Sequence, residues 1–247
     1  MQQPGSRMKG ILVINPNTTE SVTGMVLASC RQAHPDLAWE GVTSRLGAAY
    51  IASEAAYAIA AHAVLETFAN HGAQHDAVLI ACFGDPGLLA LREIAGVPVV
   101  GLAQASFLAA GKRGPFAVVT GGRAWGPMLE RFARTHLLDA QLVGIHTVEL
   151  TGAQIAAAPE QALDSLCDAC QRGINAGAGS IVLGGAALAG MAATLQARLS
   201  VPILDNVLVG AQAVVEATGR GRANTQHATG KVGPVSGLGD ALTQLLA

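Results

Sequence analysis

The stretch VLIACFGDPG places one cysteine, Cys82, between an apolar run and a turn built from glycine, aspartate and proline. A free cysteine often only fills a core. A thiol where a strand ends can instead reach a ligand, and glycine at position 84 lets the backbone approach that ligand closely. A base here needs a stabilised thiolate, because a free thiol ionises only near pH 8.5, and a helix starting in LLALREIAG would stabilise it. Core packing and acid–base chemistry at Cys82 both remain open.

Two further stretches have the composition of anion-binding turns. In NPNTT, Asn15, Asn17 and Thr18 offer amide and hydroxyl groups at an expected helix start, where a carboxylate or imide oxygen can bind. The alternative is an ordinary helix N-cap beside a proline turn. Thr120 and Gly121, in TGG, have a similar place later in the chain. The two stretches become a stronger indication of binding if the fold brings them together.

The sequence indicates neither a metal nor a cofactor. Cys167 and Cys170, in CDAC, have the spacing of a metal or redox pair, but they lie inside a predicted helix, PEQALDSLCDACQRGINAG, without a second cluster of ligands. The glycine-rich stretches GGRAWG and GRGRANTQHATGKVG do not match the nucleotide-binding patterns in a strand, turn and helix context. We therefore expect no bound metal and no cofactor.

The elements that position these residues alternate between short strands and alanine-rich helices. KGILVIN, at residues 9–15, is a continuous apolar run typical of a parallel strand covered on both faces. The same order of strand, turn and helix returns in HDAVLIACFGDPGLLALREIAG, VPVVGLAQASFLAAG, GPFAVVTGGRAWGPMLERFA, AGAGSIVLGGAALAGMAATLQARL and VPILDNVLVGAQAVVEATG. This pattern predicts βαβ units and parallel sheets.

These segments repeat at a nearly constant offset. The matched pairs are Asn15 with Thr120, 105 residues apart, Cys82 with Gly185, 103 apart, and Pro98 with Pro202, 104 apart. The repeat predicts an α/β fold of two pseudosymmetric lobes, each a mainly parallel sheet flanked by helices. Because ligands bind beyond the carboxyl ends of parallel strands, we expect the site in the cleft between the lobes.

The predicted boundaries follow from the same repeat. Residues 1–7 form a flexible tail, residues 8–103 with about 205–247 form lobe 1, and residues 104–204 form lobe 2. The stretch GRGRANTQHATGKVGPVSGLG is expected to be a loop, followed by a short helix in DALTQLLA. With their neighbours, the strand ends predict these substrate-binding residues: Asn15, Asn17, Thr18, Phe83, Gly84, Thr120, Gly121, Gly184 and Ala186.

The amino-acid composition and charge exclude some classes of binding partner. The 247 residues carry 15 lysines and arginines against 17 aspartates and glutamates, with no basic run, so we expect no nucleic acid. No apolar run reaches the ~18 residues that span a membrane, and the first residues lack the apolar segment of a signal peptide. We expect a cytoplasmic enzyme with reduced cysteines, a small-molecule substrate (a carboxylate or imide), and close helix packing that suits a homo-oligomer.

Four stretches together resemble the aspartate/glutamate/hydantoin racemase superfamily, and within it the hydantoin and allantoin racemases. They are ILVINPNTTESVT, VLIACFGDPGL, FAVVTGGRAW and IVLGGAALAGM. The resemblance covers residue 8 to about residue 217, and INPNTT followed about 65 residues later by CFGDPGL is its most specific feature. It implies a cofactor-independent isomerase with two α/β lobes and the site between them.

Racemases of this superfamily use two cysteines, one from each lobe, on opposite faces of the substrate. One thiolate removes the proton from the carbon next to a carbonyl, and the other thiol returns a proton from the opposite side. By this resemblance Cys82 is the first acid–base residue. Gly185 stands where the second cysteine is expected, because the chain reads LGGAALAGM where the family pattern reads LGCAGM.

The departure at Gly185 leaves three hypotheses. The first is a racemase of a hydantoin, allantoin or amino-acid-like substrate in which another group or a water serves the second face. The second is a single-cysteine decarboxylase of the arylmalonate type with mirrored stereochemistry. The third is a binder of small carboxylates or imides that lacks catalysis.

Overall fold

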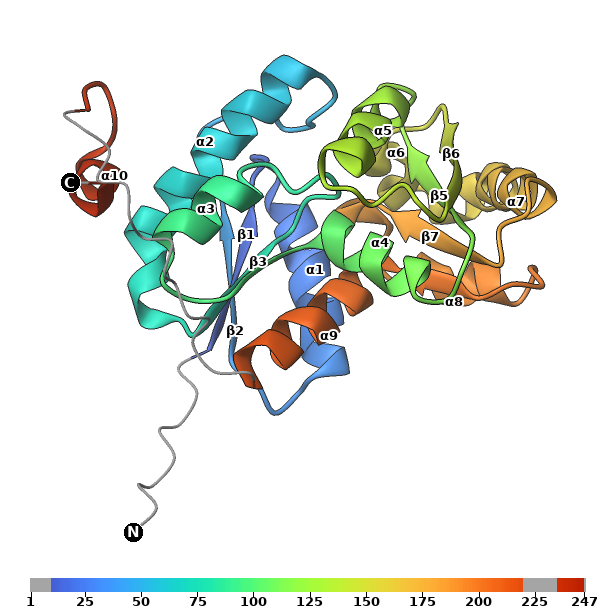
Figure 1. Ribbon diagram of the computed structural model, residues 1–247, viewed down its shortest axis with the longest axis horizontal. Helices are drawn as coiled ribbons and strands as arrows, with labels where there is room; N and C mark the ends of the chain where they lie inside the picture. Colours follow the sequence, from blue (N-terminus) through green and yellow to red (C-terminus); the bar gives the residue numbers. More distant parts are fainter. Residues whose placement is uncertain (1–9, 220–234, 247) are drawn as a thin grey trace, which may run out of the picture.

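Two four-stranded parallel sheets form the framework of the chain (Figure 1). The computed structural model describes residues 10–219 and 235–246. The first sheet has the order β2-β1-β3-β4, with β1 Ile11–Asn15, β2 Trp39–Thr43, β3 Ala77–Ile80 and β4 Val99–Gly101. The second has the order β6-β5-β7-β8, with β5 Phe116–Gly121, β6 Leu142–Val148, β7 Ser180–Gly184 and β8 Ile203–Asp205. The predicted α/β fold of two lobes is confirmed.

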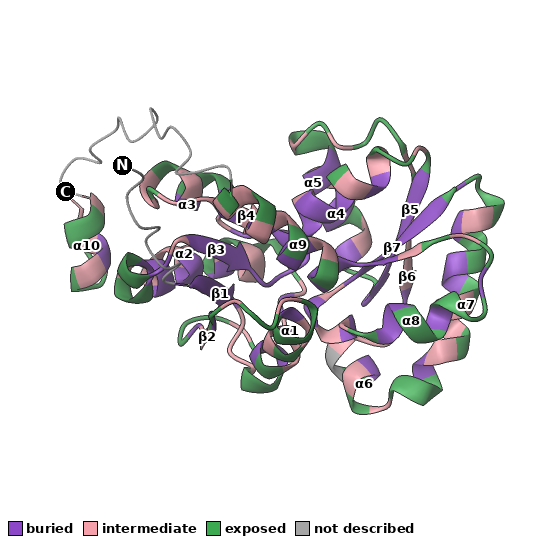
Figure 2. Ribbon diagram, turned by 90° about the horizontal axis from the view of Figure 1, so that it is seen from below, coloured by how far each residue is buried: buried purple, intermediate pink, exposed green. Residues whose placement is uncertain are grey.

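The internal repeat extends to the pairing of individual residues. Ile14 of β1 lies opposite Ile80 of β3, and the corresponding residues of the second sheet, Val119 and Leu183, are also partners. The central strands β1, β3, β5 and β7 are buried throughout, as expected for parallel strands covered by helices on both faces (Figure 2). Both sheets therefore bring the equivalent strand ends to equivalent places.

Helices cover both sheets and connect them. They are α1 Glu20–Ala33, α2 Glu54–His71, α3 Leu88–Ile94, α4 Leu102–Gly111, α5 Trp125–Thr135, α6 Gly152–Ala157, α7 Pro159–Asn175, α8 Met191–Gln196, α9 Asn206–Gly219 and α10 Asp240–Leu246, with short 3-10 turns η1 Gly72–Gln74 and η2 Ala186–Leu188. Helices α7 and α10 confirm two predicted helices. The predicted tail lies outside the described residues, as does most of the predicted loop before α10.

Besides a hydrophobic cluster of its own, each lobe contributes to a larger cluster that spans both lobes. Phe83 precedes α3, Phe107 lies in α4, and Phe116 and Phe132 lie in the second lobe, yet their rings meet. The ring centre of Phe107 lies 6.1 Å from that of Phe83, 5.5 Å from that of Phe116 and 5.9 Å from that of Phe132. Such tilted and edge-on contacts add to the burial of apolar area. The aromatic cluster fixes one lobe against the other.

Helices α1, α4 and α9 lie between the two sheets in both views (Figures 1 and 2). Helix α4 contacts β4 of the first sheet and β7 of the second, so the predicted boundary at residue 104 falls inside a helix that serves both lobes. After β8 the chain returns to the first sheet, where α9 packs against β3 and β4, and α10 packs on α2.

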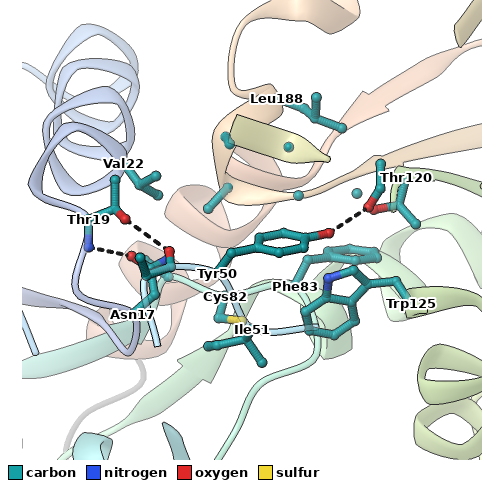
Figure 3. A pocket seen from close by; sticks show the side chains of 18 residues that line it. Asn17, Thr19, Val22, Tyr50, Ile51, Cys82, Phe83, Thr120, Trp125 and Leu188 are labelled. Atoms are coloured by element: carbon teal, nitrogen blue, oxygen red, sulfur yellow. Dashed lines mark hydrogen bonds between the residues drawn. The ribbon is translucent and has the colours of Figure 1, made fainter. Parts of the chain in front are cut away.

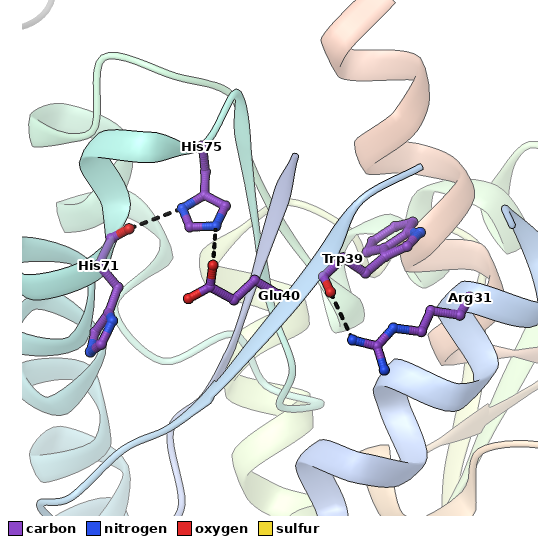
Figure 4. A network of polar contacts seen from close by, with 5 residues as sticks. All are labelled: Arg31, Trp39, Glu40, His71 and His75. Carbon is purple, nitrogen blue, oxygen red and sulfur yellow. Dashed lines mark hydrogen bonds and ion pairs between the residues drawn. The ribbon is translucent and has the colours of Figure 1, made fainter. Parts of the chain in front are cut away.

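The edge strand β2 is held at its amino end by polar contacts away from the strand ends that form the cleft (Figure 4). A ring nitrogen of His75 lies 3.1 Å from the Glu40 carboxylate, and the other lies 2.9 Å from the carbonyl oxygen of His71. Arg31 donates to the carbonyl oxygen of Trp39 at 2.9 Å.

Within the described residues, none of the helices has the length and apolar character needed to cross a membrane.

Candidate active site

A pocket with about 620 Å³ of space, part of it open to solvent, lies where strand ends of the two lobes face each other (Figure 3). Lobe 1 contributes Asn17, Thr19, Val22, Ala49, Tyr50, Ile51, Ala81, Cys82 and Phe83; lobe 2 contributes Thr120, Gly121, Trp125, Gly152, Gly184, Gly185, Ala186, Ala187 and Leu188. The predicted cleft between the lobes therefore exists, and most of its walls are apolar.

Cys82 follows β3 directly and lies in the pocket wall, with its residue only 8% exposed. Its carbonyl oxygen accepts the N–H of Asp85 at 3.0 Å, which closes the turn after the strand. Burial, and then the charge of Asp85, raise the pKa of the Cys82 thiol above its ordinary value. The prediction that the following helix lowers this pKa is wrong, because the groups that act on the buried thiol favour its neutral form.

Asp85 fixes the turn that carries Cys82. Its carboxylate accepts the backbone N–H groups of Ala103 at 2.8 Å and Gln104 at 2.7 Å, in the first turn of α4. A side chain at Gly101 would collide with this carboxylate. Burial raises the pKa of Asp85 to about 7, although these N–H donors and the nearby charge of Arg92 act in the opposite direction.

The NPNTT turn contributes only part of what its composition predicts. Asn17 lies in the pocket wall, where its side-chain oxygen accepts the N–H of Thr19 at 2.8 Å. Asn15 is fully buried beneath the turn and donates to Asn17 and to Thr23, so its amide maintains the local structure. Thr18 lines a separate surface groove. The structure thus places Asn17 in the pocket and the other two residues outside it.

The lobe 2 wall combines an unpartnered hydroxyl with a glycine. Thr120 is 4% exposed, and its hydroxyl has no hydrogen-bond partner among the described residues. Gly185 has φ +135°, which strains any residue with a side chain. A Cβ at this glycine would lie 3.3 Å from Leu188 and 3.8 Å from the Thr120 hydroxyl. The position opposite Cys82 in the repeat is therefore covered by a leucine side chain.

The predicted glycines at positions 84 and 184 serve the contact between lobes. The Trp125 ring of lobe 2 packs where Gly84 of lobe 1 lacks a side chain, and the Phe83 ring of lobe 1 packs where Gly184 of lobe 2 lacks one. Gly184 and Phe83 line the pocket, as do Gly121 and Ala186, whereas Gly84 lies outside the lining. This reciprocal packing closes the cleft on one side.

Sequence reasoning predicted Phe83 but missed Tyr50, Ile51 and Trp125, which also line the pocket. Tyr50 and Ile51 come from the long connection between β2 and α2, and Trp125 opens α5. Tyr57, in α2, donates its hydroxyl to the carbonyl oxygen of Gly84 at 2.7 Å. One signal was available: the chain has only two tyrosines and two tryptophans, and three of these four residues lie at the cleft.

The lining residues limit the chemistry of the pocket. Two of the described lining residues titrate, Cys82 and Tyr50, and no lining residue in the described chain is an aspartate, glutamate, lysine, arginine or histidine. The described residues also contain no group of three or more His, Cys, Asp or Glu side chains that could hold a metal ion. The arrangement is suited to moving a proton to or from an uncharged ligand.

A thiol at the strand ends between two similar α/β lobes is the arrangement of a racemase-type isomerase. The chain belongs to the Asp/Glu/Hydantoin racemase family, which it matches over residues 11–214.

Individual relatives agree with this assignment. The chain is 33% identical over 204 residues to a hydantoin racemase from Pseudomonas sp. (strain NS671), covering 81% of this chain and 82% of the relative. The structure of an allantoin racemase from Klebsiella pneumoniae superposes with a TM-score of 0.81 at 30% identity, covering 94% and 92% of the two chains. An allantoin racemase from Pseudomonas fluorescens gives a TM-score of 0.86 at 25% identity, covering 93% and 99%.

Proposed function

We propose that the protein racemises a hydantoin- or allantoin-type imide by proton transfer at the carbon next to a carbonyl, with Cys82 as an acid–base residue. The observation that supports this most directly is the position of the Cys82 thiol, in the wall of a largely apolar pocket between the lobes. A thiol in this place can remove a proton from one face of a bound ring.

The absence of charged side chains from the described lining favours an imide over an amino acid. A zwitterionic amino acid carries two charges, and burying them without partners is costly. A five-membered imide ring is neutral and planar, which suits a pocket walled by Tyr50, Phe83 and Trp125. Neutral polar groups remain for its oxygen and N–H groups: the Asn17 amide and the Thr120 hydroxyl.

The proposed reaction begins when the thiolate of Cys82 takes the proton of the ring carbon. The electron pair of the broken C–H bond moves toward the adjacent carbonyl and forms a planar enolate. Hydrogen-bond donors directed at the carbonyl oxygen stabilise this charge strongly in a site with little water. We assign this role to the Thr120 hydroxyl, because Thr120 lines the pocket and is buried.

Deuterium exchange at the stereocentre tests this proposal. Wild type is incubated in D₂O with single enantiomers of allantoin and 5-substituted hydantoins, and the reaction is followed by NMR and polarimetry. We expect exchange together with loss of optical rotation, and a loss of about 100-fold or more in Cys82→Ala. Cys167→Ala is the matched control, because Cys167 lies in α7 outside the pocket lining.

Two outcomes would overturn the proposal. One is full exchange and racemisation in Cys82→Ala. The other is an absence of both in wild type, with either tight binding of an imide or release of CO₂ from a disubstituted malonate. In wild type without exchange or racemisation, tight binding of an imide would indicate a binder, and release of CO₂ would indicate a decarboxylase. The uncharged lining already disfavours a malonate, which carries two negative charges.

A further inference from the structure

A racemase needs a proton-transfer group on each face of its substrate, and lobe 2 offers no cysteine for the second face. Gly185 has no side chain, and the lobe 2 residues beside it in the lining are Gly184, Ala186, Ala187 and Leu188, none of which titrates. The Thr120 hydroxyl remains protonated at any working pH and can donate a hydrogen bond but cannot serve as a base. Among the described lining residues, Tyr50 is the titratable group besides Cys82.

Tyr50 originates in lobe 1, but its hydroxyl lies against lobe 2. Its loop is fixed to the start of α1: the N–H of Thr18 donates to Ala48 at 3.2 Å, and the Thr19 hydroxyl donates to Ala49 at 2.9 Å. From this anchor the Tyr50 side chain crosses the cleft, and its hydroxyl donates to the carbonyl oxygen of Gly121 at 3.3 Å. The loop therefore delivers a phenol to the end of β5.

Figure 3 shows the two titratable groups at separate places in the pocket. The sulfur of Cys82 lies beside Ile51, whereas the phenol hydroxyl of Tyr50 lies beside Thr120. A side chain at Gly122 would collide with this hydroxyl, so the close approach depends on that glycine. Because the hydrogen bond to Gly121 is long, little is lost when the phenol turns its proton toward a ligand.

Tyr50 also marks the boundary between the pocket and the surface. It lines the pocket together with Cys82, and it lines an outer hollow together with Gly122, Arg123 and Glu149. Its ring is half-buried, and burial is the main cause of a raised pKa of its phenol, to which the nearby thiolate form of Cys82 adds. Tyr50 thus belongs to the pocket that contains Cys82 and also reaches the surface, where its phenol can exchange protons with solvent.

We propose that Tyr50 is the acid–base residue for the second face of the substrate, opposite Cys82; this inference rests on the proposed racemase function. When the α-hydrogen faces Cys82, the thiolate takes that proton and becomes a thiol. The phenol then gives its proton to the other face of the enolate carbon and becomes a phenolate.

The enantiomeric substrate reacts in the opposite direction. The phenolate takes the α-proton, and the Cys82 thiol donates its proton to the opposite face. After each turnover one proton leaves one residue and one proton returns to the other through solvent. The reaction is balanced without an oxidant, a reductant or a metal.

Tyr50→Phe tests the inference, because it removes the phenol proton and keeps the ring. Each enantiomer is incubated separately, because only one of the two presents its α-hydrogen to Cys82. In D₂O we expect inversion to fall about 100-fold. For the enantiomer whose α-hydrogen faces Cys82, the deuterated thiol should return deuterium to the same face, so exchange with retained configuration replaces inversion at a rate within about 10-fold of wild-type α-hydrogen exchange. Continued exchange also shows that the variant is folded.

Tyr57→Phe is the matched control. It removes the other tyrosine hydroxyl, which supports the Cys82 loop through the Gly84 carbonyl oxygen. If Tyr57→Phe lowers activity, we expect the rates of exchange and of inversion to fall by the same factor, so that their ratio stays constant.

Two results would overturn the role of Tyr50. Inversion in Tyr50→Phe at the wild-type rate would do so, and so would an equal loss of inversion and exchange with both enantiomers. Wild type that shows neither exchange nor inversion would overturn the proposed racemase function itself, and the role of Tyr50 with it. The two failures are therefore distinguishable.

Discussion

The turn at residues 82–87, after β3 in lobe 1, and the turn at residues 185–190, after β7 in lobe 2, have the same length but different residues. Each ends at a left-handed glycine that opens a short helix, Gly87 with φ 77° before α3 and Gly190 with φ 85° before α8. Where lobe 1 has Cys82, lobe 2 has Gly185, and where lobe 1 has Asp85, lobe 2 has Leu188. The backbone framework is repeated, whereas the chemistry is not.

Each turn is fixed by one carboxylate. In lobe 1 this carboxylate lies within the turn, and in lobe 2 it lies outside the turn, at the end of the next strand. In lobe 1, Asp85 in the turn accepts N–H groups from the start of α4. In lobe 2, Asp205 at the end of β8 accepts the N–H of Gly190 at 2.7 Å and those of Val207 and Leu208 at 2.8 and 3.2 Å, at the start of α9. One buried carboxylate per lobe thus connects a turn to the next helix.

This difference shows how the lobe 2 turn keeps its fold without the cysteine and the aspartate that the lobe 1 turn contains. Because Asp205 fixes the lobe 2 turn from outside, the position equivalent to Asp85 is free to be a leucine, which covers Gly185. Lobe 2 then contributes shape and a hydroxyl, and lobe 1 contributes Cys82 and the loop that carries Tyr50.

The largest effect is expected from removing the lobe 2 carboxylate. Asp205→Ala leaves three N–H groups without their acceptor and should lower the free energy of unfolding by about 3–5 kcal/mol. Asp85→Ala leaves two N–H groups of α4 without their acceptor and should lower the free energy of unfolding by less. Urea unfolding measures both, with the exposed Asp168→Ala of α7 as a control that changes stability by less than about 0.5 kcal/mol. An Asp205→Ala variant as stable as the control would contradict the anchoring role.

Restoring the cysteine in lobe 2 is expected to have a smaller effect. Gly185→Cys places a side chain at φ +135° and 3.3 Å from Leu188, so it should lower the free energy of unfolding by about 1–2 kcal/mol. Gly185→Ala is the matched control, with the same Cβ and no thiol. We expect racemisation in neither variant to exceed that of wild type. A rise of several-fold with cysteine but not with alanine would mean that the second face is served from position 185.

The smallest effect is expected in the pH dependence of kcat/KM, when the charge of Asp85 is removed. Activity that needs the Cys82 thiolate should still rise with pH above the ordinary thiol range near 8.5, because burial and the charge of Asp85 raise the pKa of this thiol. Asp85 has a pKa of about 7 and is charged above that pH, so Asp85→Asn should move the rising limb of kcat/KM to lower pH. Asp168→Asn should leave the limb in place. A limb that stays fixed or moves upward in Asp85→Asn would exclude this electrostatic coupling.

The sequence predicts the framework well because the repeat fixes it. Three residue pairs with nearly equal offsets define two sheets, and the ends of parallel strands define the cleft, so Cys82, Thr120 and Gly185 could be placed without coordinates. Asn15 shows the limit of this reasoning. It ends β1 in the predicted place, but its side chain turns beneath the NPNTT loop to bind Thr23, a choice that depends on packing against α1.

Tyr50 could not be predicted for a similar reason. It lies in an irregular connection between β2 and α2, where no periodic pattern indicates which side chain turns inward. Its position results from the hydrogen bond of Thr19 to the neighbouring Ala49 in lobe 1 and from its own hydrogen bond to Gly121 in lobe 2, and both partners are distant in sequence. The pKa of Cys82 likewise depends on burial and on the orientation of Asp85, which the order of residues does not reveal.

The isotope pattern of wild type at low conversion tests the central claim that each face of the substrate meets its own proton-transfer group. A single enantiomer of a racemised hydantoin is incubated in D₂O, and both enantiomers are separated and analysed by mass spectrometry before a tenth has reacted. With Cys82 and Tyr50 on opposite faces, the newly formed enantiomer should carry deuterium while the remaining substrate keeps hydrogen. Equal deuterium in both enantiomers would show that one group serves both faces, and would contradict the account.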